Sequence, residues 1–306
     1  MNYQEKELKV FNQQNITIDM DVKPVLKWVG GKRQLIPDIR EFYKDLSPNK
    51  YVEPFFGGGA VYFDILNTLG LEHKETAIIN DVNQDLIDMY RNIKSNPEEL
   101  IKCCNSLEKD YKKYDYYFIR EKFNGVDSNK NKIDRYEGIE RSAALIVINR
   151  TCFNGLYRVN SKGLFNVPKG RYKNPTILDE ENLYKLSSLL PKVENIRCQE
   201  FDAIKDIKKG DLVYFDPPYH PLNETSSFTS YSGAFGREEQ IRLRDYFQTL
   251  NHKGVHVILS NSSAPFIKEI YSEHRIHEVF SPRNINSRSD KRGKIPEYLV
   301  LGDSLS

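Results

Sequence analysis

The chain has 306 residues, which is enough for one large domain or two modest domains with a buried core. Hydrophobic residues make up 39% and charged residues 29% of the chain, as in an ordinary globular protein, and its formal net charge of +2 gives no indication of a general polyanion binder. No apolar run reaches about 18 residues, which excludes a membrane span, and the first 21 residues lack the apolar centre of a signal peptide.

Strand and helix patterns alternate in the first part of the chain. Residues 51–66 (YVEPFFGGGAVYFDIL) predict a short strand, a glycine loop and the start of a helix. Residues 76–93 predict a second strand that ends at Asp81, followed by a helix. Residues 97–123 continue as one helix, and 138–150 (GIERSAALIVINR) predict an amphipathic helix, because apolar residues recur at three- and four-residue steps.

The segment from 151 to 176 has no clear period and is rich in Gly, Asn, Pro and basic residues, with aromatic residues between them. It predicts loops carried on a helical support. No acidic residue occurs from Arg141 to Leu178, and a second basic stretch lies at 283–294. Local basic patches of this kind suit a phosphate backbone, although a solvated lysine-rich loop has the same composition.

Alternation resumes after residue 176. Strands are predicted at 194–199, 211–216 and 254–262, helices at 237–250 and 264–273, and two final strands joined by a basic loop at 274–302. We therefore predict an α/β fold, a doubly wound Rossmann-like sheet with an inserted, mainly helical module. The predicted division is a polar arm at 1–22, a catalytic domain formed by 23–95 and 177–306, and an inserted recognition domain at 96–176.

The glycine loop indicates a cofactor site. Gly57 and Gly59 allow a tight turn and a close approach of a ligand to the backbone, before a helix N-terminus. Asp81 comes 22 residues after Gly59 at the end of the next strand, where a carboxylate can accept from ribose hydroxyls. Glu53 precedes the loop, and a carboxylate there favours a cationic ligand over a pyrophosphate. S-adenosyl-L-methionine carries a sulfonium and an ammonium, so it is a better candidate than NAD, which carries two phosphates. We also expect Phe55 to contact this cofactor.

A second Gly-Gly pair in LKWVGGKRQL (26–35) also precedes a helix pattern. The indole of Trp28 offers a flat cover for the adenine or the methionine part of the cofactor, with Lys32 beside it.

The most informative stretch is DLVYFDPPYHPL (211–222), a strand that ends on an acid held by two prolines. Proline has no N–H, so the Asp216 carboxylate and the Pro217 carbonyl face outward as acceptors without competing donors. A planar amino group fits there, with one hydrogen on Asp216, the other on the Pro217 carbonyl and Tyr219 stacked on the ring. When both hydrogens are accepted in this way, the nitrogen lone pair points toward an electrophile. That electrophile would be the methyl group on the sulfonium.

The ordered segments KWVGGKRQLIPDI, VEPFFGGGAVYF, INDVNQDLI, FNGLYRVNSKGLFNVPKGRYKNP, FDPPYHPL and FTSY resemble those of the Dam-type DNA adenine-N6 methyltransferases, especially the DpnII group. The resemblance covers about residues 23–301 and implies methylation of adenine N6 within GATC. It implies that Asp216, Pro217 and Tyr219 are catalytic. For the methyl donor it implies contacts from Trp28, Lys32, Asp81, Asp202 and Asp216, and for the DNA duplex contacts from Lys27, Phe153, Asn154, Leu156, Arg158 and Pro168.

These implied roles agree with the physics of the basic insert. A stacked adenine must be flipped out at a cost of a few kcal/mol, and an aromatic wedge offsets part of this; Phe153 stands where the family commonly has tyrosine. Arg158 can grip guanine, whereas Arg150 and Arg171 are expected to meet phosphates with Lys162, Lys169 and Lys173.

Two alternatives stay open: a methyltransferase for another planar amine (cytosine N4, an RNA base or a protein glutamine), and a non-catalytic DNA-binding protein of the same fold. The four cysteines show no paired spacing and the six histidines do not cluster, so we expect a cytoplasmic bacterial or phage protein without a catalytic metal. We expect double-stranded DNA as partner and a monomer, which makes no direct contact with any restriction endonuclease that shares its site.

Overall fold

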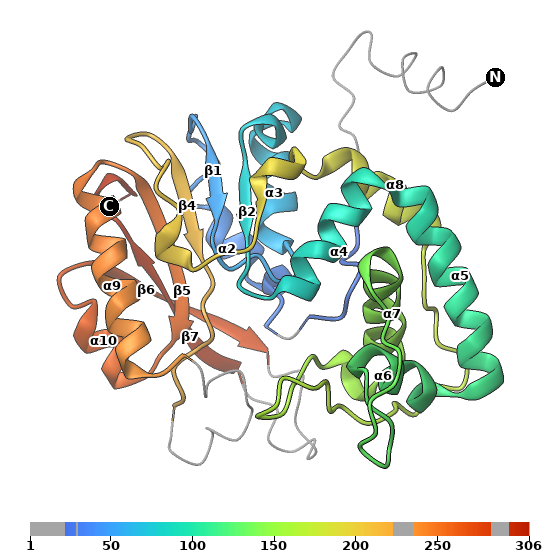
Figure 1. The fold of residues 1–306 in the computed structure, drawn as a ribbon. Helices are drawn as coiled ribbons and strands as arrows, with labels where there is room; N and C mark the ends of the chain where they lie inside the picture. Colours follow the sequence, from blue (N-terminus) through green and yellow to red (C-terminus); the bar gives the residue numbers. More distant parts are fainter. Residues whose placement is uncertain (1–21, 29, 223–234, 283–293, 306) are drawn as a thin grey trace, which may run out of the picture.

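The computed structural model describes residues 22–28, 30–222, 235–282 and 294–305 (Figure 1). Most of the predicted N-terminal arm, the FTSY segment at 228–231 and the basic stretch at 283–293 lie outside the described residues. No helix in the described ranges is long and apolar enough to cross a membrane.

The centre of the fold is a single mixed sheet, which within the described residues has seven strands in the order β3-β2-β1-β4-β5-β7-β6. The first five strands of that order are mutually parallel, and β7 runs antiparallel between β5 and β6. The strands are β1 (Tyr51–Glu53), β2 (Ile78–Asn80), β3 (Ile196–Arg197), β4 (Leu212–Phe215), β5 (His256–Ser262), β6 (Arg275–Pro282) and β7 (Lys294–Leu301).

Successive strand residues point to opposite faces, so the sheet feeds two separate apolar clusters. One cluster joins Val52, Ile78 and Val213 to apolar residues of α9 (Arg237–His252) and α10 (Pro265–Ile270). The other joins residues of the opposite face to α2 (Ile36–Arg40), α3 (Ala60–Leu69) and α4 (Gln84–Ser95). Helices on both faces of a largely parallel sheet confirm the predicted doubly wound α/β class (Figure 1).

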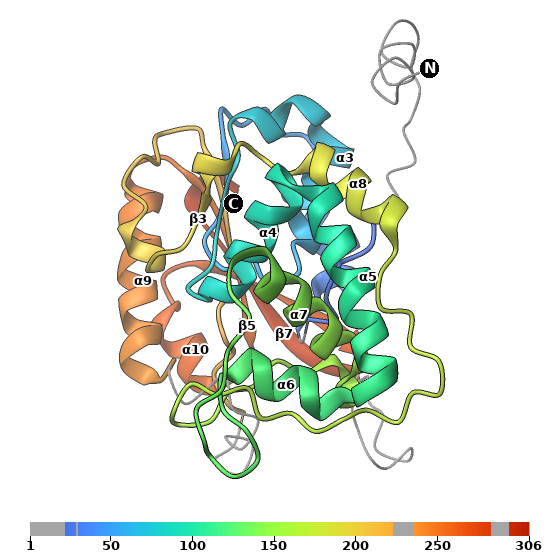
Figure 2. The same cartoon turned by 45° about the vertical axis from the view of Figure 1, so that its right-hand side comes forward.

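A group of helices stands beside the sheet and comprises α5 (Pro97–Tyr114), α6 (Tyr116–Asn124), α7 (Gly138–Thr151) and α8 (Glu180–Leu189) (Figure 2). The prediction of one helix over 97–123 was wrong, because the chain breaks at Asp115, whose φ of 81° cannot continue an α-helix. The second apolar cluster runs without interruption from the sheet into α5, α7 and α8.

The helix predicted at 138–150 is present as α7, but it is not amphipathic. Its residues from Ser142 to Asn149 are all buried, since α4, α5 and α6 pack around it. A helix buried on every side has no polar face to produce a period, which explains the difference. Sequence patterns also gave no indication of α8, which Asp179 caps by accepting from the Asn182 N–H.

The segment after α7 forms a short hairpin rather than only loops. Asn166 N donates to the Arg158 carbonyl at 3.0 Å, Asn160 N donates to the Leu164 carbonyl at 2.9 Å, and Val159 pairs with Phe165 as a β-bridge. The turn of this hairpin (158–166) contains Gly163 with φ of +74°.

Candidate active site

Three acids predicted for the site follow three neighbouring parallel strands. Glu53 is the last residue of β1, Asp81 follows β2, and Asp216 follows β4. Because β2, β1 and β4 are adjacent in the sheet and parallel, their carboxyl ends meet at one edge. The fold therefore brings residues 163 positions apart into one cluster.

Trp28 packs directly on the glycine loop that follows β1. Gly57 has φ of +50°, and a Cβ added there would lie 2.9 Å from the indole, so only glycine lets Trp28 lie directly on the loop. The Gly57 N–H donates to Asp81 at 3.1 Å, and the Tyr90 hydroxyl donates to the Gly57 carbonyl at 3.0 Å. Gly59 has φ of +69° and faces Phe56 so closely that a Cβ there would lie 2.5 Å from its ring.

Asp81 is an acceptor fixed in place by the backbone. One oxygen accepts from Gly57 N and the other from Asn83 N at 2.9 Å. Burial raises the pKa of Asp81 to about 6, and the backbone hydrogen bonds to the carboxylate oppose this rise. Carboxylate lone pairs that the two N–H groups leave unused can accept further hydrogen bonds, as ligand hydroxyls require.

Glu53 is 2% exposed, and it accepts a hydrogen bond from the Tyr51 hydroxyl at 2.8 Å. Burial raises the pKa of Glu53 well above its ordinary value; the charge of Asp216 raises it further, and that of Lys32 lowers it. Burial likewise raises the pKa of Asp216, against the effect of Lys32. Two neighbouring acids thus share one ammonium, and because both pKa values are raised, a further positive charge bound nearby would favour their ionised forms.

Lys32 is almost completely buried and points into the acid segment. Its Nζ lies 2.8 Å from Asp216 Oδ1, donates to the Gly30 carbonyl at 2.7 Å, and lies 4.6 Å from the centroid of the Tyr219 ring. An N–H donor can therefore occupy the space between the carboxylate and the aromatic face.

The main chain of the Asp216–Tyr219 segment is held by side chains that sequence patterns did not indicate. Gln240 of α9, fully buried, donates to the Pro218 carbonyl at 2.9 Å and accepts from Asn261 of β5 at 3.0 Å. Asn261 in turn accepts from His220 N at 3.2 Å. Among the described residues no donor pairs with the Pro217 carbonyl, whereas the Pro218 carbonyl is taken.

Glu297 of β7 was also missed. The Tyr219 hydroxyl donates to its Oε2 at 2.6 Å, although the two residues are 78 positions apart. A single glutamate in an alternating strand pattern has no local signal that could have identified it.

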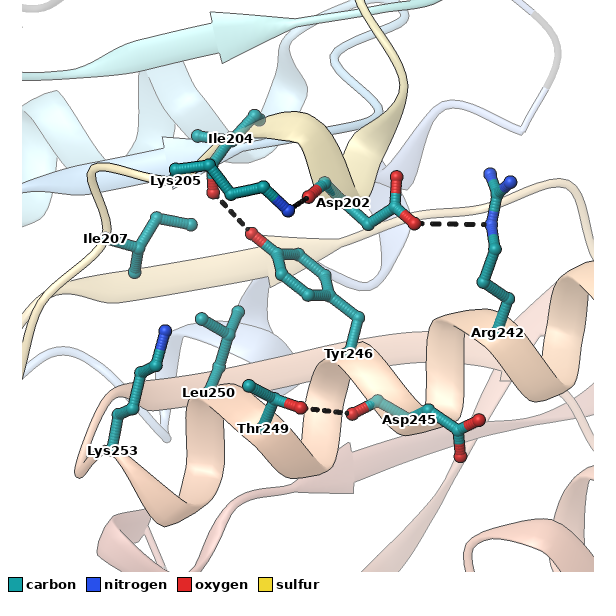
Figure 3. A pocket seen from close by; sticks show the side chains of 10 residues that line it. All are labelled: Asp202, Ile204, Lys205, Ile207, Arg242, Asp245, Tyr246, Thr249, Leu250 and Lys253. Atoms are coloured by element: carbon teal, nitrogen blue, oxygen red, sulfur yellow. Dashed lines mark hydrogen bonds and ion pairs between the residues drawn. The ribbon is translucent and has the colours of Figure 1, made fainter.

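Phe55 and Asp202 lie on the side of the site that faces α9. The Phe55 ring packs against Phe201 at 5.4 Å, measured between centroids. The Asp202 carboxylate is 3.5 Å from Arg242 Nε, and it lines a cavity of about 330 Å³ against α9 (Figure 3). None of the other predicted cofactor residues lines that cavity, and the partner of the Asp202 carboxylate there is Arg242 of α9.

Lys27 is joined to α7 and to the segment that follows it. The fully buried amide of Asn149 accepts from Lys27 N at 2.8 Å and donates to the carbonyls of Lys27 at 3.3 Å and Gly155 at 2.9 Å. The Trp28 and Tyr157 ring centroids are 5.5 Å apart. The predicted donor-contacting Trp28 is therefore adjacent both to the glycine loop and to Tyr157, the residue before the hairpin.

The predicted wedge residues lie together on the surface. Phe153 is 46% exposed, and its N–H donates to the carbonyl of the exposed Pro168 at 2.8 Å. Asn154 is exposed with φ of 54°, a conformation that asparagine tolerates. Leu156 is half-buried and packs on the core, so it is less available than Phe153.

The predicted DNA-contacting arginines differ in availability. Arg158 is held along one edge, with Nε donating to Asn166 Oδ1 at 2.7 Å. Arg171 is exposed. Arg150 is half-buried, and its Nη2 donates to the Pro24 carbonyl at 3.3 Å, so its guanidinium ties α7 to the segment before Trp28. Burial lowers the pKa of Arg150.

Comparison with known proteins identifies relatives of this chain. The family model described as D12 class N6 adenine-specific DNA methyltransferase matches residues 28–285. The type II methyltransferase M1.LlaDCHI of Lactococcus lactis subsp. cremoris is 44% identical over 287 residues, covering 92% of this chain and 95% of the relative. The type II methyltransferase M.MjaIII of Methanocaldococcus jannaschii is 44% identical over 297 residues, covering 92% and 99%. A DNA adenine methylase of Haemophilus influenzae is 32% identical over 295 residues, covering 94% and 96%.

The match of the family model to most of the chain confirms the family that the ordered motifs resemble. Together with the acid–proline segment at the end of β4, it shows that the chain belongs to the D12 class of N6 adenine-specific DNA methyltransferases.

Proposed function

We propose that this enzyme transfers a methyl group from S-adenosyl-L-methionine to N6 of an adenine flipped out of double-stranded DNA, within the sequence GATC. The observation that carries the proposal is the arrangement of acceptors after β4. Gln240 occupies the Pro218 carbonyl, which leaves the Asp216 carboxylate and the Pro217 carbonyl to accept the two hydrogens of a planar amine.

The charge of the site fits a cationic methyl donor. Glu53 and Asp216 are neighbouring acids with one ammonium, that of Lys32, between them, so a ligand with positive charge is favoured. Bound there, the donor supplies an electrophilic methyl group on a sulfonium. Trp28 would cover it against the glycine loop, and Asp81 and Glu53 would supply acceptors for its ribose hydroxyls and its charged end.

Lys32 marks the place of the target amine. Its ammonium donates to Asp216 and stands over the Tyr219 ring, so it must leave before a nucleobase can enter. A donor carboxylate would attract Lys32 away from Asp216, and this orders the two binding events.

In the transfer step Asp216 and the Pro217 carbonyl hold both N6 hydrogens and turn the nitrogen lone pair toward the methyl carbon. The N–C bond forms as the S–C bond breaks, and the sulfur keeps the electron pair. Asp216 stabilises the positive charge that develops on N6, which then loses a proton.

For the DNA, we propose that Phe153 enters the duplex as the wedge, supported by Asn154, Leu156 and Pro168. Lys27 and Arg158 contact bases, and Arg171 meets a phosphate. Arg150 differs from Arg171 because its Nη2 already donates to the Pro24 carbonyl. A phosphate contact from Arg150 would therefore use only the rest of its guanidinium. The GATC site rests on the resemblance of the insert to Dam-type enzymes.

We also propose a division of the chain into domains, an oligomeric state and a cellular location. We propose 96–176 as the recognition domain and 23–95 with 177–306 as the catalytic domain, in an enzyme that acts as a monomer in the cytoplasm of a bacterium or a phage host. Asp202 is proposed as a contact of the donor's adenine only if it exchanges Arg242 for that ligand.

The test is direct. Plasmid DNA treated with purified enzyme and S-adenosyl-L-methionine is digested to nucleosides, and its modified sites are mapped. We expect N6-methyladenine, confined to GATC. Asp216→Ala should abolish it while DNA affinity stays within about tenfold, because the carboxylate acts on the amine and not on the duplex. Asp245→Ala, at an exposed aspartate of α9, is the matched control. Methylcytosine without N6-methyladenine would refute the proposed substrate, and modification at other sequences would refute GATC.

A further inference from the structure

Glu297 lies on β7, outside every motif used above, and contacts a residue of the proposed catalytic segment. Its Oε2 accepts from the Tyr219 hydroxyl at 2.6 Å. We propose that Glu297 is a positioning residue that holds the Tyr219 ring against the target base and strengthens the attraction of that ring for positive charge. This inference rests on the proposed function of the Asp216–Tyr219 segment.

The positioning role follows from what else holds the segment. Gln240 and Asn261 bind its main chain at Pro218 and His220, but they leave the plane of the Tyr219 ring free. The hydroxyl lies at the far end of the ring axis, so the hydrogen bond to Glu297 fixes the direction of that axis. Because a phenol O–H lies in the plane of its ring, the direction of the hydrogen bond also favours one ring plane. A hydrogen bond to a carboxylate is shorter and stronger than one to a neutral acceptor.

Glu297 is well placed to act as an anchor. It pairs with Ser262 of β5 on one side and with Val279 of β6 on the other, so its backbone lies between two hydrogen-bonded strands. An acceptor mounted inside a sheet moves less than one on a loop.

The electrostatic role follows from the ammonium of Lys32. It lies 4.6 Å from the Tyr219 ring centroid and 2.8 Å from Asp216, so ring face and carboxylate already stabilise one cation together. Donation of the phenol hydrogen to Glu297 moves electron density into the ring and places an anion behind it. The methyl transfer creates positive charge on N6 in the same space. Since that charge appears only as the N–C bond forms, Glu297 should affect the transfer rate more than ground-state binding.

The test uses two variants that remove opposite halves of the contact. Glu297→Gln keeps an acceptor oxygen and removes the charge, and Tyr219→Phe keeps the ring and removes the hydroxyl. We expect each to lower the single-turnover rate of methyl transfer about tenfold, the cost of losing charge assistance to one hydrogen bond. Affinities for donor and DNA should stay within about twofold.

The double variant and a control complete the experiment. Glu297→Gln with Tyr219→Phe should be no slower than the slower single variant, because both changes remove the same interaction. Glu278→Gln, at an exposed glutamate of the neighbouring strand β6, should transfer at the wild-type rate. Flipping is followed separately by the fluorescence of 2-aminopurine at the target position.

Three results would overturn the inference: a Glu297→Gln rate within twofold of wild type, rate losses that multiply in the double variant, or a loss confined to DNA affinity. Should Glu297→Gln prove unstable in thermal unfolding, Tyr219→Phe decides alone, since a wild-type rate there rules out any role through the hydroxyl. Wild-type enzyme that makes no N6-methyladenine would instead refute the proposed function, so the two failures are distinguishable.

Discussion

Asn149→Ala is the change with the clearest expected consequence, because this one amide joins Lys27, the neighbour of Trp28, to Gly155 in the segment after α7. The truncation removes three hydrogen bonds in a fully buried place: to Lys27 N at 2.8 Å, to the Lys27 carbonyl at 3.3 Å and to the Gly155 carbonyl at 2.9 Å. Each buried hydrogen bond contributes about 0.5–1.5 kcal/mol, so the free energy of unfolding should fall by about 2–3 kcal/mol.

A second asparagine supplies a matched control. Asn182 of α8 accepts from Lys23 N at 2.8 Å and donates to the Lys23 carbonyl at 2.8 Å, which repeats the same clamp four residues earlier in the segment. Asn182→Ala removes two hydrogen bonds where Asn149→Ala removes three, so it should cost about two thirds as much free energy of unfolding. Only Asn149→Ala displaces Lys27 and Trp28, and loss of one contact worth about 1.4 kcal/mol weakens binding about tenfold. We expect that loss for both the methyl donor and DNA.

Urea unfolding gives the stability of both variants, and calorimetry with S-adenosyl-L-methionine and with a GATC duplex gives the affinities. The reasoning is refuted if Asn149→Ala unfolds within about 0.5 kcal/mol of wild type. It is equally refuted if Asn182→Ala weakens both ligands as much as Asn149→Ala does, because the effect would then be general loosening of the segment.

Three further predictions concern the cofactor loop and the hairpin. Burial raises the pKa of Asp81 from 3.8 to about 6, so its contribution to stability is present below pH 3.8 and is lost as the pH rises through 6. The difference in unfolding free energy between wild type and Asp81→Asn should therefore fall between pH 3.8 and 6. A difference that does not change with pH would contradict this prediction. Gly57→Ala, which puts a Cβ 2.9 Å from Trp28, should weaken donor binding measured by calorimetry, whereas Gly163→Ala, with nothing within 4 Å, should leave it unchanged although both glycines have positive φ. Arg158→Ala should relax base choice at one position in a panel of duplexes; uniform weakening with a smaller salt slope would make Arg158 a phosphate contact.

The sequence determined those features whose signal is local. The ends of β2 and β4 were predicted at Asp81 and Asp216, one residue beyond the observed ends, because apolar runs that stop at an acid or a proline need only neighbouring residues to be recognised. The doubly wound class followed from the same alternation. The α5–α6 break and the buried α7 were not predictable, since one depends on the conformation of Asp115 and the other on helices packed around it.

Only the tertiary structure decided which side chains are available at the site and which are already paired with other residues. Arg150 and Asp202 look available in the sequence, yet one is tied to Pro24 and the other to Arg242. Asn149 and Glu297 carry no motif, yet one joins Lys27 to Gly155 and the other holds Tyr219. The physical reason is sequence distance: periodicity records which face of an element is buried, but a hydrogen bond between residues 78 or 122 positions apart leaves no pattern near either one.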